Sequence, residues 1–175
     1  MGSYLWKWRH PTESLSKRVH CKDSLIALLL RQIEIETMKL EFHHINYVSE
    51  DVDRLHDFYT NVLGLEDIPI ASFPRPKATD TSGYDGKIKF ATDGSMQFHL
   101  ATKDLTVAFK NGEVINPVER GHIAFRTDDI QALMALLDDN GIPYSDYGTA
   151  FAKEWHQVFF HDPEGNVIEV HQAVG

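Results

Sequence analysis

The chain of 175 residues has a single cysteine, Cys21, and no apolar run near the roughly 20 residues that a membrane-spanning helix needs. One cysteine cannot form an intrachain disulfide, and we expect the protein in a reducing compartment such as the cytoplasm. Basic residues are also scarce, since the chain has 17 lysines and arginines and 26 acidic residues, for a net charge of -9. Such a chain lacks a broad basic face for phosphate backbones, so we expect no nucleic acid and no membrane among its partners.

Residues 1–37 differ in charge from the rest of the chain. They hold six basic residues and four acids, a balance of +2, so the remaining 138 residues carry -11. Asp23 can cap a helix from Ser24 to about Thr37, and this predicts a helical N-terminal extension. The apolar run Leu25–Leu30 is shorter than a signal-peptide core. We expect residues 1–37 to be dispensable for folding and residues 38–175 to form one domain.

An internal repeat organises the chain after Met38. A shift of 78 residues superposes five pairs in order: His44 on His122, Asp51 on Asp129, Val52 on Ile130, Leu55 on Leu133 and Phe58 on Leu136. In each copy a strand-like run precedes an aspartate that can cap a helix, and an amphipathic helix follows. A glycine ends each helix, Gly64 in the first copy and Gly141 in the second.

Further strand-like segments follow the helix in each copy. In the first copy they cover roughly 66–72, 87–91 and 96–101, and in the second roughly 144–148, 155–161 and 167–171. Each copy therefore reads β-α-β-β-β, with modules at about 40–103 and 119–174 and a connector over 104–119. The predicted fold class is α+β, in which two tandem βαβββ modules form a cupped mixed sheet after the helical extension.

Histidine is abundant, with ten in the chain, and it is the commonest metal ligand in proteins. His44 and His122 lie on the first strand of each copy, and His99 and Glu169 lie on the last. Strand alternation puts His99 and Glu169 on the face opposite their apolar neighbours, so the four side chains converge on the concave face. Three imidazoles and one carboxylate suit a divalent ion such as Zn, Ni, Co, Mn or Fe, with two octahedral positions left open.

Other polar and aromatic residues near these strands are candidates for lesser roles. His43 adjoins His44, and alternation predicts that it faces the other way and is not a ligand. His171 shares the face of Glu169, and we expect it to contact the substrate or to support the carboxylate. Aromatic residues in loops or at strand starts are expected to line the substrate pocket: Phe73, Tyr84 and Trp155.

Three motifs of the chain resemble those of the vicinal oxygen chelate superfamily, which includes glyoxalase I, bleomycin-resistance proteins and extradiol dioxygenases. They are Phe58-Tyr59-x-x-Val62-Leu63-Gly64-Leu65, Gly121-His122-Ile123-Ala124-Phe125 and Phe160-x-Asp162-Pro163-x-Gly165-Asn166-x-Ile168-Glu169. The resemblance covers about residues 40–173. It implies paired modules cupped around one divalent metal ion, a small-molecule substrate that chelates through two adjacent oxygens, and a homodimer.

The resemblance also implies an activity. The closest likeness is to glyoxalase I, so we expect a metal-dependent lyase or isomerase, similar to lactoylglutathione lyase, in which Glu169 is also the catalytic group that shuttles a proton. Two alternatives stay open. One is an Fe(II)-dependent ring-cleaving dioxygenase that uses His44, His122 and Glu169. The other is a resistance protein that binds a drug or metabolite, although such relatives generally lack the metal ligands.

The chain departs from the glyoxalase I pattern at three positions. His99 stands where bacterial glyoxalase I usually has Glu and the epimerases have Gln, Lys103 stands where an Asn commonly follows, and Val48 stands where an Arg is expected. His99 bears most on the reaction, because a fourth ligand leaves room for a chelating substrate but little for dioxygen as well.

Overall fold

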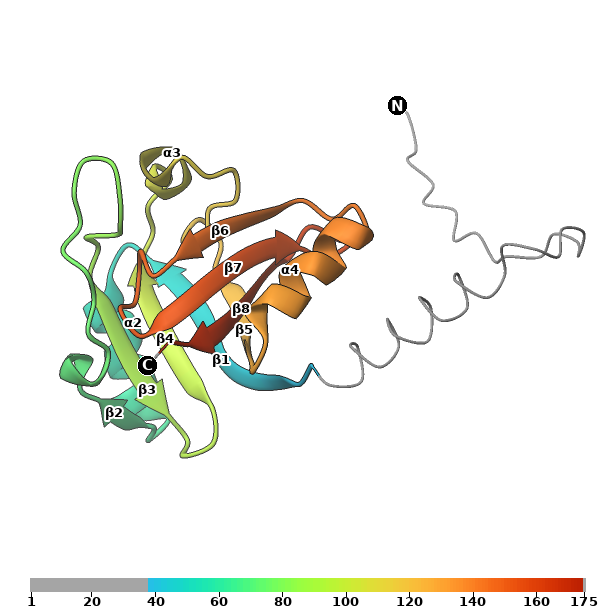
Figure 1. The fold of residues 1–175 in the computed structure, drawn as a ribbon. Helices are drawn as coiled ribbons and strands as arrows, with labels where there is room; N and C mark the ends of the chain where they lie inside the picture. Colours follow the sequence, from blue (N-terminus) through green and yellow to red (C-terminus); the bar gives the residue numbers. More distant parts are fainter. Residues whose placement is uncertain (1–37, 175) are drawn as a thin grey trace, which may run out of the picture. The chain divides into compact units, whose positions relative to one another are not determined.

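The computed structural model describes residues 38–174, so the predicted helical extension over residues 1–37 lies outside the described residues. Eight strands form one sheet in the order β2-β3-β4-β1-β5-β8-β7-β6 (Figure 1). In chain order the strands are β1 Leu40–Ser49, β2 Glu66–Ile68, β3 Ile88–Thr92, β4 Gln97–Thr102, β5 His122–Thr127, β6 Tyr144–Gly148, β7 Trp155–His161 and β8 Val167–Ala173. The helices are α2 Val52–Asp57, continued by a π-helical turn Phe58–Val62, a 3-10 turn Ile70–Ser72, α3 Val107–Asn111 and α4 Ile130–Asp139.

The strand order confirms the predicted pair of modules. Each module contributes four neighbouring strands, and β1 and β5 join the modules as an antiparallel pair at the centre. β1 runs parallel to β4, and β5 runs parallel to β8 in the same way. Ile45 lies opposite Ile123 in the central pair, and these two residues are also equivalent in the 78-residue repeat. An approximate two-fold axis therefore passes between them.

The helix that follows the first strand of each module begins and ends as predicted. The Asp51 carboxylate accepts a hydrogen bond from the backbone N–H of Arg54, and Asp129 accepts one from Ala132. Both bonds satisfy N–H groups that an N-terminal turn leaves free. Gly64 after the first helix and Gly141 after the second have positive φ angles of 76° and 65°.

Two predicted segments differ from the structure. The strand predicted over about 66–72 is only Glu66–Ile68, because Pro69 has no N–H for the sheet and starts the 3-10 turn Ile70–Ser72. The connector over 104–119 contains a short helix, α3, which ends at Gly112 with a φ of 72°. Within residues 38–174 no helix is long and apolar enough to cross a bilayer.

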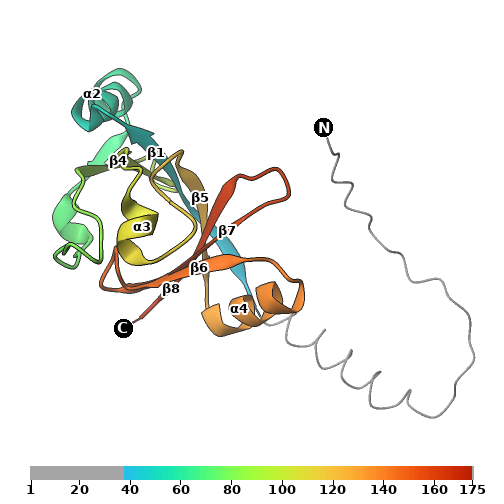
Figure 2. The same cartoon turned by 90° about the horizontal axis from the view of Figure 1, so that it is seen from above.

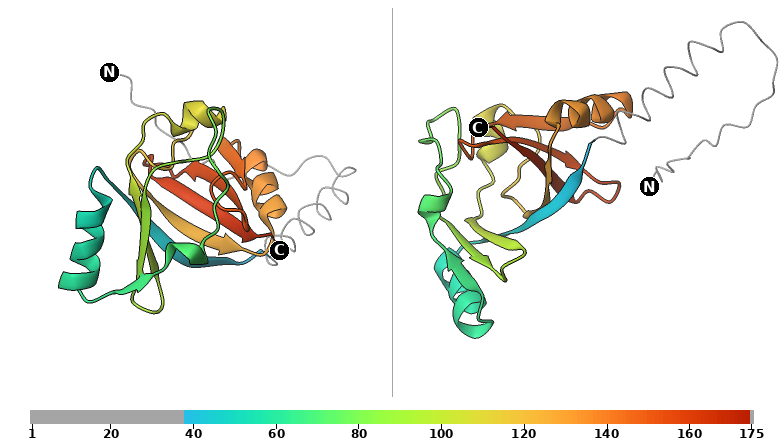
Figure 3. Two further views of the ribbon diagram at one scale, coloured as in Figure 1. Left: turned by 90° about the vertical axis from the view of Figure 1, so that its left-hand side faces the viewer. Right: turned by 60° about the horizontal axis from the view of Figure 1, so that its bottom comes forward.

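The two faces of the curved sheet are covered differently. On the outer face, α4 packs its Ile130, Leu133 and Leu137 on Val158 and Val170 of the sheet. The inner face carries a second apolar cluster, in which α3 and its flanking connector pack on β4 and β7: Tyr84, Ala101, Val107, Ile115, Val118, Tyr147 and Phe159. Figures 2 and 3 show α2 and α4 flanking the sheet at opposite ends, with α3 over its hollow side. The connector therefore closes one end of the cup.

Candidate metal centre

Three of the four predicted ligands meet on the inner face of the sheet. Ligand atoms of His44, His122 and Glu169 all lie within 4.8 Å of one another. Oε2 of Glu169 is 3.0 Å from Nε2 of His122 and 3.6 Å from Nε2 of His44. The three residues come from β1, β5 and β8 of one chain, and all are buried, with exposures of 1% for His44 and Glu169 and 9% for His122.

The register of the strands shows how the repeat builds this cluster. Ala124 of β5 lies opposite Glu169 of β8, as its repeat equivalent Asn46 of β1 lies opposite His99 of β4. In the central pair, His122 lies opposite Asn46. The parallel pairs thus bring the last strand of each module beside its first strand, with the polar side chains on one face.

Neighbouring groups orient the imidazole of His122 and the carboxylate of Glu169. Nδ1 of His122 donates a hydrogen bond to the backbone oxygen of Pro117 at 2.9 Å, which fixes the ring so that Nε2 faces the cluster. Oε1 of Glu169 accepts hydrogen bonds from Gln157, at 3.1 Å, and from Nδ1 of His171, at 2.9 Å. The other carboxylate oxygen is left to face His44 and His122.

Burial and mutual contact set the ionisation of the cluster. Burial lowers the pKa of His44 to about 4. Burial alone would raise the pKa of Glu169, but His44, His122 and His171 hold it well below its ordinary value. A neutral His44 and an ionised Glu169 are the protonation states in which these side chains bind metals.

The donor set fits a divalent metal ion. Two imidazole nitrogens and one carboxylate oxygen are ligands that Zn, Fe, Co, Ni and Mn accept, and three ligands leave coordination positions for a substrate. Glu169 is an almost fully buried anion, and no lysine or arginine among residues 38–174 forms an ion pair with it. A cation bound between the three ligand atoms would supply the missing positive charge.

His99, the fourth predicted ligand, lies against this cluster without joining it. Its ring stacks on His44 with centroids 3.6 Å apart and an interplanar angle of 14°. Its Nε2 is 3.0 Å from the side-chain oxygen of Gln97. The structure therefore brings together three of the predicted ligands. The ring of the fourth, His99, borders the site.

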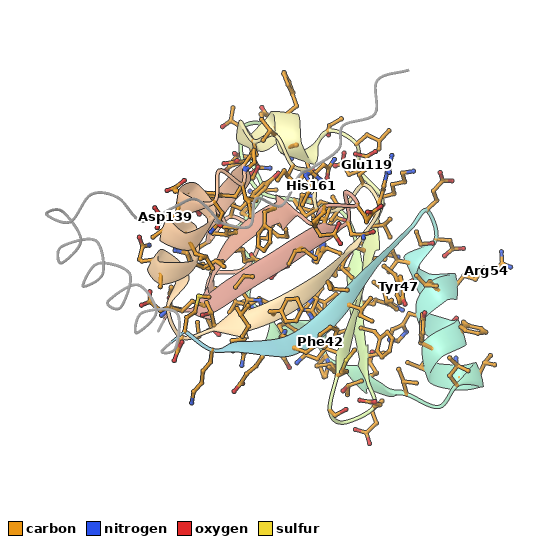
Figure 4. The ribbon with its side chains drawn as sticks, turned by 90° about the vertical axis from the view of Figure 1, so that its right-hand side faces the viewer. Phe42, Tyr47, Arg54, Glu119, Asp139 and His161 are labelled. Atoms are coloured by element: carbon orange, nitrogen blue, oxygen red, sulfur yellow. The ribbon has the colours of Figure 1, made fainter. Side chains whose placement is uncertain are left out.

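The prediction that His43 faces away from His44 was wrong. The register between β1 and β5 shifts between Phe42 and His44, so a β-bulge interrupts the alternation of side chains. Nδ1 of His43 lies 2.9 Å from Nδ1 of His44, and the His43 ring packs edge-on against His171 at 4.7 Å. Farther along the strand Tyr47 points to the outer face, where it lies between β1 and α2 (Figure 4) and its ring stacks on Tyr59.

The residues predicted to line a pocket divide into two groups. Trp155 stacks on His171 with centroids 4.4 Å apart and an angle of 9°, and Phe73 lies 5.6 Å from His99 and 5.7 Å from Trp155. These aromatic rings border the polar cluster. Tyr84 instead belongs to the apolar cluster under α3, and its hydroxyl donates a hydrogen bond to the backbone oxygen of Thr102 at 2.5 Å.

Three polar residues of the site were not predicted. Gln157 holds Glu169, Arg126 contacts His43 and His171, and Asn46 lies between His99 and His122 in the sheet. Within residues 38–174, the buried side-chain oxygens of Asn46 and Gln157 have no hydrogen-bond partner. Alternation from His122 to Arg126, and from His44 to Asn46, was the signal that would have found two of them.

Fold and site together define a protein of paired βαβββ modules with a histidine–carboxylate cluster in the cup of its sheet. The sequence matches the Glyoxalase/Bleomycin resistance protein/Dioxygenase superfamily over residues 43–160, more than half of the chain. The chain belongs to this superfamily. It is also 30% identical over 132 residues to "Glyoxylase I 4" of Arabidopsis thaliana, a match that covers 73% of this chain and 68% of that protein.

Solved structures support the fold. A hypothetical protein from Bacillus halodurans C-125 is 18% identical, with a TM-score of 0.54 over 79% of this chain and 96% of that one. Methylmalonyl-CoA epimerase from Mycobacterium tuberculosis is also 18% identical, with a TM-score of 0.51 over 77% of this chain and 89% of that one. At this identity the likeness concerns the fold and not the reaction.

Proposed function

We propose that the protein is a divalent-metal-dependent lyase or isomerase of the glyoxalase type, acting on a small molecule with two adjacent oxygens. The observation that carries the proposal is the convergence of His44, His122 and Glu169 on the inner face of the sheet. The likeness to "Glyoxylase I 4" supports the choice of reaction class. The single cysteine supports a cytoplasmic location, and the superfamily resemblance supports a homodimer, and we propose both.

In this proposal His44, His122 and Glu169 hold the ion. A bound divalent ion supplies Lewis acidity toward the two substrate oxygens and so stabilises negative charge that develops on them. His171 and Gln157 fix the carboxylate through Oε1. The pKa of Glu169 is lowered, so its carboxylate is ionised at neutral pH and ready to accept a proton from a substrate carbon.

The remaining polar and aromatic groups of the cup have proposed roles in substrate binding. The unpartnered oxygens of Asn46 and Gln157 are acceptors for a substrate hydroxyl or an ordered water. Phe73 and Trp155, with His171 stacked on Trp155, give the site an aromatic border that limits the access of water to the reacting atoms.

The test is metal analysis of the purified protein followed by an activity screen. We expect close to one divalent ion per chain, and turnover of the glutathione hemithioacetal or another vicinal-oxygen substrate that stops on chelation and returns on reloading. Glu169→Ala should lose both metal and turnover, while the exposed control Glu164→Ala should keep both. A metal content near zero, or full activity of Glu169→Ala, would contradict the proposal and favour a binding protein.

A ring-cleaving dioxygenase is the second candidate. It is favoured by the position of His99, which leaves two histidines and one carboxylate as the converging set, the arrangement typical of non-haem Fe(II) enzymes. Oxygen consumption by the Fe(II)-loaded protein with a catechol separates this candidate from the first, because a lyase or isomerase consumes no oxygen.

A further inference from the structure

Arg126 stands on the inner face of the sheet beside the candidate metal centre. It follows His122 by four residues on β5 and lies opposite His171 of β8. Nη2 of the guanidinium donates to Nε2 of His43 at 2.8 Å, and Nε donates to Nε2 of His171 at 3.5 Å. The guanidinium carbon is 6.0 Å from the centre of the Trp155 ring. The rings of His43, His171 and Trp155 on the inner face thus surround the guanidinium of Arg126.

This cation has no counterion among residues 38–174. Among residues 38–174 no carboxylate lies within ion-pair distance of Arg126, although Lys87 and Lys89 pair with Asp53, and Arg120 pairs with Glu119. Its two hydrogen-bond acceptors are imidazole nitrogens and not carboxylate oxygens.

The guanidinium also has unused hydrogen-bonding capacity. Arginine carries five N–H donors, and the two contacts with His43 and His171 use one each. A half-buried charge without a partner is unfavourable, and a planar guanidinium matches the two oxygens of a carboxylate or phosphate. The two imidazoles fix the orientation of the guanidinium before a ligand binds, which lowers the entropy lost on binding.

We propose that Arg126 anchors an anionic oxygen group of the substrate, a carboxylate or a phosphate. The contact of His43 with both Arg126 and His44 means that one imidazole ring separates the anchor from the metal centre. One small molecule can therefore reach both. The geometry of Arg126 supports anion binding by itself. The use of this anchor by a metal-chelating substrate rests on the proposed function.

The first experiment tests the anchor without metal. Benzoate, phenyl phosphate and the neutral analogue benzamide are titrated into the full chain, and the arginine Nε–Hε resonances are followed by NMR. The Arg126 signal is assigned by its loss in Arg126→Lys. We expect a saturable shift of that signal with at least one of the anions and none with benzamide, and the anion that binds identifies carboxylate or phosphate. No shift with either anion, or an equal shift with benzamide, overturns the proposal.

The second experiment tests whether one molecule binds both Arg126 and the metal centre. The dissociation constants of catechol and 3,4-dihydroxybenzoate are measured on Co(II)-loaded protein from its visible spectrum. A charge-assisted hydrogen bond predicts that the wild type prefers the carboxylate probe by at least about tenfold. Arg126→Met should lose this preference, measured as the ratio of the two dissociation constants on the same variant, while Arg120→Met, at an arginine paired with Glu119, should keep it.

The two experiments fail in different ways. If catechol binds and the wild type shows no preference for the carboxylate, the anchoring of a chelating substrate is overturned and the metal centre stands. If the protein takes up no cobalt, the proposed function fails, and the metal-free titration alone supports or overturns the anchor.

Discussion

Nδ1 of His171 lies 2.9 Å from Oε1 of Glu169, and this contact turns the second carboxylate oxygen toward His44 and His122. His171 is completely buried and its ring stacks on Trp155, so its position is fixed by packing as well as by the hydrogen bond. A residue outside the proposed set of three ligands thus orients the carboxylate oxygen that is proposed to bind the metal.

Replacing His171 should therefore weaken the metal centre. His171→Phe keeps a ring against Trp155 but removes the donor to Glu169, and we expect the metal affinity to fall by about 10- to 100-fold. Competition with a chromophoric chelator measures the affinity. The exposed His161→Phe is the matched control and should keep wild-type affinity. Unchanged affinity in His171→Phe would show that Gln157 alone orients the carboxylate.

His99→Phe tests the number of ligands. The phenyl ring preserves the stack on His44, and Nε2 of His99 already contacts Gln97, so we expect the affinity to stay within about threefold of the wild type. The visible spectrum of the Co(II)-loaded variant should also match that of the wild type. A loss like that of Glu169→Ala, with an altered spectrum, would instead make His99 the fourth ligand.

Gly121, which precedes His122, is expected to tolerate no side chain. A Cβ there would lie 2.3 Å from the backbone oxygen of Asn46, and its φ is +85°. Gly121→Ala should lower the free energy of unfolding by at least about 2 kcal/mol and weaken metal binding, since β1 and β5 must separate. Gly94→Ala shares a positive φ, +92°, but has open space, so it should show only the smaller backbone cost. Chemical denaturation measures both, and equal losses would contradict the close approach.

The metal-free protein should lose stability in mild acid. The pKa of His44 is about 4 in the folded chain and 6.5 in the unfolded one, so between these values the unfolded state binds more protons. The free energy of unfolding therefore falls as the pH drops from 6.5 to 4, by about 3 kcal/mol from His44 alone. The lowered pKa of Glu169 extends the loss below pH 4.5.

Denaturation curves of the metal-free chain at pH 6.5, 5.5 and 4.5 measure this dependence. His44→Gln removes the titrating imidazole, so its stability should fall less steeply across the same range. If the variant and the wild type fall in parallel, the acid sensitivity arises elsewhere in the chain.

The repeat made much of the fold and site predictable. His44 and His122 are equivalent in the repeat and lie on equivalent strands, β1 and β5. Glu169 lies on β8, the last strand of its module, beside β5, as the repeat predicts. The sequence did not reveal the bulge at His43, since alternation assumes an unbroken strand. The prediction that Tyr84 lines the substrate pocket failed for a related reason. Its place in a loop does not indicate that α3 covers it. Interactions between distant segments decided both cases.

The central pairing of β1 with β5 has a consequence for assembly. Neither module holds the full set of converging ligands, because His44 belongs to the first and His122 and Glu169 to the second. A chain severed in the connector between Lys103 and Glu119 would give two fragments, each with an unpaired strand edge where its partner belongs. Uptake of an ion by the mixed fragments would then show that β1 and β5 had paired. The candidate metal centre would in this way measure correct assembly of the two modules.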